Sequence, residues 1–389
     1  MVARLLYVAA FLWLARMAGV EALGEFGFAL TVASYLSLCV QLGIDQVAVR
    51  EVSRFPVRLA SYSRPILGLR LFLAGSVYSL LLIYAKTAHF SYRAAILLAI
   101  CGLTSFSSAL STRWAFQSQN RPKPLALATI AAQLVFAAGV SMAKGPNGVY
   151  WAAGAQVAGE WLAAILLYVL LRPRDARGPR WEPQFNRKML LNSWPISVSL
   201  FLGNLLYSFD VLALGWLAEP SQVGLYLAVY RCATVFSPIL SMLQISILPE
   251  FSRAYPDQKK LRSLARGILA PTLAICCALG LFLAVFAVPV LRTLYGTQYL
   301  QGAALLRILC WSLPFQGMRS VLRQVLVACH WQRRDSLNMG LAVLTSVTLD
   351  LLLVPRFGAY ACAWATVAAE FVLFVFSFRA AWQATRAHP

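Results

Sequence analysis

The chain has 389 residues, of which 60% are apolar and 12% charged, and its mean hydropathy is +0.68. A soluble chain carries about 25% charged residues, so this composition is that of an integral membrane protein. A spanning helix needs about 20 mostly apolar residues, which leaves room for roughly ten to twelve spans. A separate catalytic domain of about 100 residues has no place outside the membrane, and a membrane-anchored soluble enzyme is therefore excluded.

The net charge of +20 would indicate a nucleic-acid ligand in a soluble protein. Here the Lys and Arg residues collect in short loops between apolar runs, so membrane topology explains the charge and no nucleic-acid partner is expected. The eight cysteines lie in apolar runs without CxxC spacing, and the three histidines are scattered. This distribution is typical of packing residues, and we expect neither a metal site nor a cofactor.

Twelve apolar runs follow one another along the chain, and they predict an all-α polytopic membrane protein with about 12 transmembrane helices. The first run is weak because Arg4 precedes it and Arg16 interrupts it. A signal peptide is the alternative interpretation, but the run continues through Gly19 into the next span without a processing site, which favours a short first helix. The runs are 5–20, 26–49, 66–85, 93–116, 125–143, 148–171, 190–217, 222–249, 265–290, 303–329, 337–354 and 358–381.

The Lys and Arg residues are distributed unequally between the two sets of loops. The segments after the even-numbered runs hold 21 of them and the opposite segments hold six. By the positive-inside rule both termini are expected to be cytoplasmic. The longest loop, 172–189, is rich in Pro and Arg and lies near the middle of the chain. It predicts a linker between an N-lobe, 1–171, and a C-lobe, 190–389.

The two halves of the chain contain matching sequences. The stretch 148–150, followed by Glu160, recurs 210 residues later as 358–360, followed by Glu370. A second pair of similar stretches, one in each half of the chain, keeps the same order at a similar offset. Together the two pairs predict a duplicated six-helix unit. Because six is even, both copies share one orientation, and we expect two parallel six-helix lobes around a central cavity. This architecture is typical of transporters.

Eleven ionisable residues fall inside or beside the predicted spans. An Arg that faces lipid at mid-depth costs roughly 2.5–3.5 kcal/mol on insertion scales, so most of these residues must face protein or water. Those near helix ends, Arg70, Arg113, Asp45 and Asp350, are expected to snorkel toward the membrane surface. The deepest are Arg231, Arg319, Glu160 and Glu370, and the others are Arg70, Arg113, Arg307, Arg323, Asp45, Asp210 and Asp350.

Arg319 and Arg323 are four residues apart and share one helix face, with Gln316 beside them. Such a face suits a diphosphate group, because guanidinium groups pair bidentately with phosphate oxygens. The alternative is that these arginines pair with Glu160, Asp210 or Glu370 and hold helices together. The sequence leaves both interpretations open.

Three embedded acids are candidates for coupling or gating. The repeat favours equivalent structural roles for Glu160 and Glu370, and the alternative is that at least one of them couples transport to a proton or a cation. Asp210, which precedes an apolar stretch, is a comparable candidate. No phosphate-binding loop, dinucleotide fingerprint or nucleophile elbow is present, so we expect a transporter and not an enzyme.

Several stretches resemble the oligosaccharide flippases of the polysaccharide biosynthesis group, within the multidrug/oligosaccharidyl-lipid/polysaccharide exporter superfamily. They include LARMAG at 14–19, LGID at 42–45, DVLALG at 210–215 and DLLLVPRFG at 350–358. Each motif is loose, but in this order they cover nearly the whole chain. The remaining stretches are 24–27, 49–51, 223–226, 230–231, 248–249 and 294–296.

The resemblance implies a two-lobed bundle in the bacterial inner membrane, surrounded by membrane lipids. Such a protein moves an undecaprenyl-diphosphate-linked oligosaccharide, a unit of O-antigen in lipopolysaccharide, of capsule or of exopolysaccharide, from the cytoplasmic to the outer leaflet by alternating access with H⁺ or Na⁺ coupling. It makes Arg231, Arg319 and Arg323 candidate partners for the diphosphate. Members of this group start with a longer first helix, whereas this chain begins close to the end of that helix.

Two other functions compete with this interpretation. A multidrug or metabolite exporter of the same superfamily would favour a cavity dominated by carboxylates, whereas the embedded arginines favour an anionic substrate. A polytopic membrane glycan enzyme would need a large extramembrane loop with catalytic acids or His, and the outward loops are short and carry few acids. A lipid-linked oligosaccharide flippase is the leading hypothesis.

Overall fold

The computed structural model describes residues 2–88, 90–171, 180–235 and 237–386. Within these ranges every regular element is helical, so the predicted all-α fold is confirmed. Nine helical segments are long and apolar enough to cross a membrane, again counting only the described ranges. The protein is therefore a multi-pass membrane protein. The chain divides into two compact units, Met1–Asn204 and Leu205–Pro389, which we call the first and the second unit.

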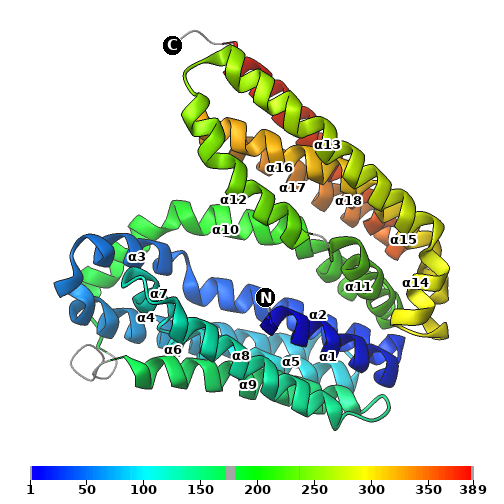
Figure 1. Ribbon diagram of the computed structural model, residues 1–389. Helices are drawn as coiled ribbons and strands as arrows, with labels where there is room; N and C mark the ends of the chain where they lie inside the picture. Colours follow the sequence, from blue (N-terminus) through cyan, green and yellow to red (C-terminus); the bar gives the residue numbers. More distant parts are fainter. Residues whose placement is uncertain (1, 89, 172–179, 236, 387–389) are drawn as a thin grey trace. The chain divides into compact units, whose positions relative to one another are not determined.

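The first unit contains the helices α1 to α9 and the beginning of α10 (Figure 1). Within it, α8 packs closely along α9, and α1 packs against α8. The elements are α1 (Val2–Ala18), α2 (Val20–Gln41), α3 (Ile44–Arg54), η1 (Pro56–Arg58), α4 (Leu59–Thr87), α5 (Tyr92–Gly102), α6 (Thr104–Leu110), α7 (Arg113–Ser118), α8 (Pro122–Ser141), α9 (Gly148–Leu170) and α10 (Pro183–Leu217).

The second unit continues from the end of α10 to α18 (Figure 1). Within it, α17 packs along α18, and α16 contacts both α13 and α18. The elements are α11 (Pro220–Thr234), α12 (Ser237–Ala254), α13 (Gln258–Val285), α14 (Ala287–Leu294), η2 (Thr297–Gly302), α15 (Ala303–Leu309), α16 (Ser312–Ala328), α17 (Gln332–Phe357) and α18 (Ala359–Ala384).

Each of the twelve predicted runs corresponds to helical structure, but five of them are interrupted. The run 26–49 is divided between α2 and α3 at Leu42 and Gly43, whose φ angles are 38° and 64°. A Cβ atom on Gly43 would lie 3.0 Å from the carbonyl oxygen of Ser193 and from the amide nitrogen of Ser197, so only glycine lets α10 approach this closely. The other interrupted runs are 93–116, 222–249, 265–290 and 303–329. An apolar run does not reveal such breaks, because hydropathy continues through them.

The region predicted as a linker, 172–189, is only partly described, because residues 172–179 lie outside the described ranges. The amide of Arg180 donates a hydrogen bond of 3.1 Å to the carbonyl oxygen of Arg64. From Pro183 onward the chain is helical and belongs to α10. The end of this region therefore packs on the first unit.

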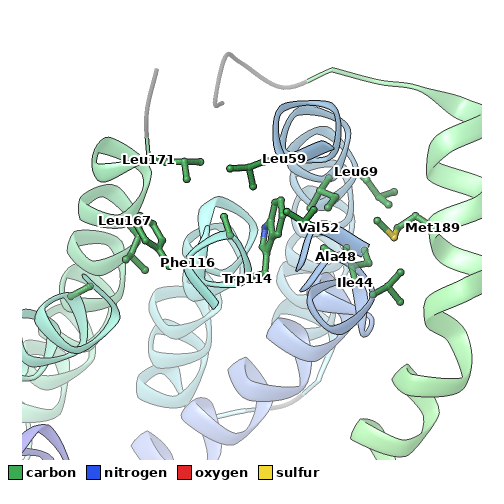
Figure 2. Packing of buried hydrophobic residues seen from close by; sticks show 14 of the residues in the cluster. Ile44, Ala48, Val52, Leu59, Leu69, Trp114, Phe116, Leu167, Leu171 and Met189 are labelled. Atoms are coloured by element: carbon green, nitrogen blue, oxygen red, sulfur yellow. The ribbon is translucent and has the colours of Figure 1, made fainter. Parts of the chain in front are cut away.

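An apolar cluster forms one end of the first unit's interior (Figure 2). Trp114 and Phe116 of α7 are buried at its centre, with Ile44 of α3 and Leu69 of α4 beside them. Met189 brings α10 into the same cluster. Inside a membrane the alternative surroundings of such side chains are also apolar, so close van der Waals packing holds the cluster together. The cluster therefore fixes α3, α4, α7 and α10 relative to one another, and these helices carry several of the polar groups described below.

Candidate functional site

The first unit encloses a polar cavity of about 530 Å³. Its wall comes from α2, α3, α6, α7, α8, α9 and α10. Hydroxyl and amide groups dominate the wall, and three ionisable side chains, Asp45, Arg113 and Glu160, reach it. The remaining lining residues are Ser34, Ser37, Leu38, Gln41, Ser107, Ser108, Ser111, Thr129, Ala132, Gln133, Ala163, Ala164 and Asn204.

Glu160 lies in the wall of this cavity at the middle of α9. Its carboxylate accepts hydrogen bonds from Gln156 Nε2 at 3.0 Å and from Ser107 Oγ at 3.3 Å. The neighbouring Gly159 brings α8 close, because a Cβ atom there would lie 2.5 Å from the carbonyl oxygen of Ala132. Arg113 interacts electrostatically with Glu160. Glu160 is thus held mainly by neutral donors.

Asp45 reaches the same cavity and forms an ion pair behind the wall. Arg70 Nη2 lies 2.7 Å from Asp45 Oδ1, and the Arg70 side chain is completely buried. Arg70 Nη1 also donates to the carbonyl oxygen of Ser111 at 3.4 Å. The prediction that Arg70 snorkels is wrong. A position near a helix end sets the depth of a residue, whereas burial depends on the direction in which its side chain points.

The second unit encloses a cavity of about 340 Å³. Among the described residues, Arg319 is the one charged residue in the wall of this cavity. Gln316 and Ser320, also on α16, lie beside Arg319. Two tyrosines, Tyr207 of α10 and Tyr230 of α11, also line it. The other lining residues are Thr234, Leu240 and Gln244.

Arg319 is 6% exposed and is held from behind by an acid. Its Nε lies 3.0 Å from Glu370 Oε2, and its Nη2 donates to the hydroxyl of Tyr207 at 2.9 Å. Gln316 Nε2 donates to the other oxygen of Glu370 at 3.5 Å. The structure thus brings together Gln316, Arg319 and Glu370, three of the residues singled out from the sequence.

Arg323 and Arg231 lie elsewhere in the second unit. Arg323 Nε lies 3.2 Å from Asp335 Oδ2, and its side chain is 44% exposed. Arg231, in the last turn of α11, interacts electrostatically with Tyr295. In the described part of the chain, neither arginine belongs to the wall of the 340 Å³ cavity.

Asp210 belongs to a separate buried cluster in the second unit. Tyr226 and Thr366 both donate hydrogen bonds to Asp210 Oδ2, the second at 2.8 Å. The carboxyl group of Asp350 interacts with that of Asp210 and accepts a hydrogen bond from Ser346 at 3.5 Å. The Oδ1 atoms of both aspartates are buried and lack a hydrogen-bond donor among the described residues.

Asp350 is fully buried, so the prediction that it snorkels is also wrong. Its pairing with Asp210 was not predicted, although both residues were expected to be embedded acids. The spacing of Ser346 and Asp350, one helical turn apart, predicts only that Ser346 can donate to Asp350. No group of three or more His, Cys, Asp or Glu side chains that could hold a metal ion occurs in the described residues.

A family model described as "Polysaccharide biosynthesis protein" matches residues 1–255. A protein of Shigella dysenteriae described as "Putative O-antigen transporter" is 25% identical over 250 residues, which are 59% of this chain and 61% of that protein. The chain spans 40% to 61% of the curated relatives that it matches.

Two solved structures have a similar fold. The lipid II flippase MurJ, in an inward closed conformation, matches with a TM-score of 0.80 and 14% identity over 97% of this chain and 85% of that one. An inward-facing multidrug resistance MATE transporter of the MOP superfamily matches with a TM-score of 0.75 and 15% identity over 99% of this chain and 96% of that one. These likenesses confirm the predicted fold. The family model described above covers residues 1–255, which is well over half of the chain. The chain therefore belongs to the polysaccharide biosynthesis protein family.

Proposed function

We propose that this protein is a flippase for a lipid-linked oligosaccharide. The substrate is an undecaprenyl-diphosphate-linked unit of O-antigen, capsule or exopolysaccharide, and alternating access carries it from the cytoplasmic to the outer leaflet of a bacterial inner membrane. Both termini face the cytoplasm. Family membership and the likeness of the fold to a lipid II flippase support the proposal.

The observation that carries the proposal is the position of Arg319. A buried guanidinium group in the wall of a polar cavity offers a planar pair of donors to a phosphate oxygen. Gln316 and the hydroxyl of Tyr207 add neutral hydrogen-bonding groups beside it. We assign Arg319 and Gln316 to the diphosphate, with Arg231 and Arg323 as further cationic groups that attract it.

Glu370 has a gating role in this proposal. It lies 3.0 Å from Arg319 and balances the guanidinium charge when no substrate is bound. A diphosphate that reaches Arg319 competes with Glu370 for the same donors. Substrate binding and the Arg319–Glu370 ion pair therefore exclude each other in part.

Asp210 and Asp350 have the coupling role. Two interacting carboxyl groups in a buried site repel each other unless a proton or a cation neutralises one of the charges. Their two Oδ1 atoms, together with the hydroxyl groups of Thr366 and Ser346, form an oxygen-rich set that suits H⁺ or Na⁺. Glu160, which is held by neutral donors, is a second candidate for proton coupling.

A multidrug exporter is the second candidate function, because the fold also resembles a multidrug transporter. The presence of Asp45 and Glu160 in the wall of the first unit's cavity favours it. Arg319 opposes it, since a buried guanidinium group repels an organic cation. The two functions therefore make opposite predictions about substrate charge.

Transport into proteoliposomes tests the proposal. Purified full-length protein is expected to move a fluorescent undecaprenyl-diphosphate oligosaccharide between leaflets, and Arg319→Gln is expected to lower that rate at least tenfold. Arg307→Gln is the matched control, because Arg307 is an exposed arginine of α15 whose guanidinium contacts only the backbone oxygen of Ala284 among the described residues. Movement of an organic cation with no movement of the lipid-linked sugar would establish the exporter instead.

A further inference from the structure

The cavity of the first unit has a wall that suits the hydroxyl groups of a sugar. Five serine hydroxyls line it, two from α2 and three from α6 and the turn after it, and Thr129 and Gln133 add polar groups from α8. Polar side chains are costly inside a membrane protein unless a partner satisfies them. Its volume of about 530 Å³ is within the range of roughly 300–1,000 Å³ that is typical of small-ligand sites.

Gln133 points to a missing ligand. Its Oε1 atom is buried and has no hydrogen-bond partner among the described residues. A buried acceptor without a donor costs about 1–3 kcal/mol, so such atoms are uncommon in native proteins and call for an explanation. The residue lines the cavity, and rotation of its side-chain amide would present this oxygen to a hydroxyl group of a bound ligand.

The other groups in the wall accept hydrogen bonds more readily than they donate them. The Glu160 carboxylate, at the same wall, has two neutral donors, Gln156 and Ser107, and retains further acceptor positions. Ser108 and Ser37 contact each other through their hydroxyl groups at 3.0 Å, which leaves lone pairs available. An acceptor-rich wall favours a ligand with several O–H or N–H donors.

The charges in the wall give an acidic ligand no net attraction. Asp45 and Glu160 reach the cavity, whereas Arg70, the partner of Asp45, is completely buried behind it. Arg113 is the one guanidinium group of the described residues that lines the cavity. Counting Arg70, two carboxylates and two guanidinium groups balance, so the wall gives a uronic or sialic acid no net attraction and tolerates a neutral polyhydroxylated ring.

We infer that the cavity of the first unit is a binding site for the neutral sugar of the transported glycan, with Gln133, Ser107 and Glu160 as its hydrogen-bonding residues. This inference rests on the proposed function. It assigns sugar recognition to the first unit and recognition of the diphosphate to Arg319 in the second. The site determines which glycan is carried, and Arg319 does not distinguish one sugar from another.

Three fluorescent lipids test the inference with the full-length protein in proteoliposomes. All carry undecaprenyl diphosphate; one has no sugar, one ends in a neutral hexose and one in a uronic acid. The wild type is expected to move the hexose lipid fastest. Gln133→Leu, which has nearly the same volume, is expected to slow the hexose lipid about 3- to 10-fold, the effect of one lost hydrogen bond, and to leave the sugar-free lipid unchanged.

Two variants complete the test. Gln119→Leu makes the same change at an exposed position outside the cavity and is expected to leave all three rates unchanged. Arg319→Gln is expected to slow all three lipids together. Equal slowing of the sugar-free and hexose lipids by Gln133→Leu would overturn the inference, and so would preference of the wild type for the uronic acid.

A direct binding measurement separates failure of the inference from failure of the proposed function. If the wild type moves none of the lipids, the proposed function is wrong, and binding of methyl glucoside to the purified protein still tests the site by saturation-transfer NMR. A signal that Gln133→Leu removes and Gln119→Leu retains would support the site. Absence of that signal in the wild type would overturn it.

Discussion

The cavities of the two units differ in the charges at their walls, with Asp45, Glu160 and Arg113 lining the first and Arg319 lining the second. In the first unit a carboxylate, Asp45, reaches the cavity and its guanidinium partner, Arg70, is buried behind it. In the second unit the guanidinium group of Arg319 reaches the cavity and its partner, Glu370, is not among the described lining residues. An ion pair is neutral as a whole, but the member at the wall determines which ligand binds.

The same comparison shows how a repeated sequence can acquire two functions. Glu160 accepts a hydrogen bond from Ser107, and Glu370 accepts one from Gln316. The two acids are 210 residues apart and their two partners 209 apart, so the arrangement recurs. The residue 209 positions before Arg319, and so its counterpart in the first unit, is Leu110. The guanidinium group that pairs with the acid in the second unit is therefore absent at the equivalent sequence position of the first.

The largest expected effect comes from removing the acid that pairs with Arg319. Glu370→Gln leaves the buried Arg319 without its counter-ion and is expected to lower the free energy of unfolding by about 3–5 kcal/mol. The double variant Arg319→Gln, Glu370→Gln is expected to recover most of this loss, because two neutral side chains replace the pair. Thermal unfolding of the purified protein in detergent measures both.

Glu160→Gln is the matched variant in the first unit. It is expected to cost less than about 1 kcal/mol, since Gln156 and Ser107 are neutral donors and an amide oxygen still accepts from one of them. Equal destabilisation by Glu160→Gln and Glu370→Gln would show that the two acids have the same structural role and would contradict the comparison.

A smaller effect is expected at Asp45. Asp45→Asn leaves Arg70 buried, but the carbonyl oxygen of Ser111 remains as an acceptor at 3.4 Å, and the Asp45 side chain itself is 23% exposed. We expect a loss of about 2–4 kcal/mol in the free energy of unfolding. The double variant Arg70→Met, Asp45→Asn is the control and should be more stable than Asp45→Asn alone. The opposite order would mean that the Arg70 guanidinium is not held mainly by Asp45.

The smallest effect is expected at Arg323. Its ion pair with Asp335 lies at a partly exposed position, with 44% of the arginine side chain and 20% of the aspartate side chain accessible. Arg323→Gln is therefore expected to change the free energy of unfolding by less than about 1 kcal/mol. If it lowers transport while the unfolding temperature stays unchanged, Arg323 contributes to substrate attraction. An unchanged transport rate would remove it from the proposed site and leave Arg319.

Much of the fold follows from the pattern of apolar residues. All twelve predicted runs correspond to helices, since a run of about 20 apolar residues in lipid must satisfy its backbone hydrogen bonds internally. The breaks were not predictable in the same way. The division at Leu42 and Gly43 depends on the close approach of α10 to α3, a contact between segments about 150 residues apart.

The sequence by itself determined that the chain is a membrane protein of the polysaccharide biosynthesis group with charged side chains inside its spans. It also identified Gln316, Arg319 and Glu370, and the structure places these three together. Only the tertiary structure decided that Arg70 pairs with Asp45, that Asp350 adjoins Asp210, and that Gln133 lines a cavity while its Oε1 lacks a donor among the described residues. Position along a helix gives the depth of a charge in the membrane, but its partner depends on which neighbouring helix its side chain faces.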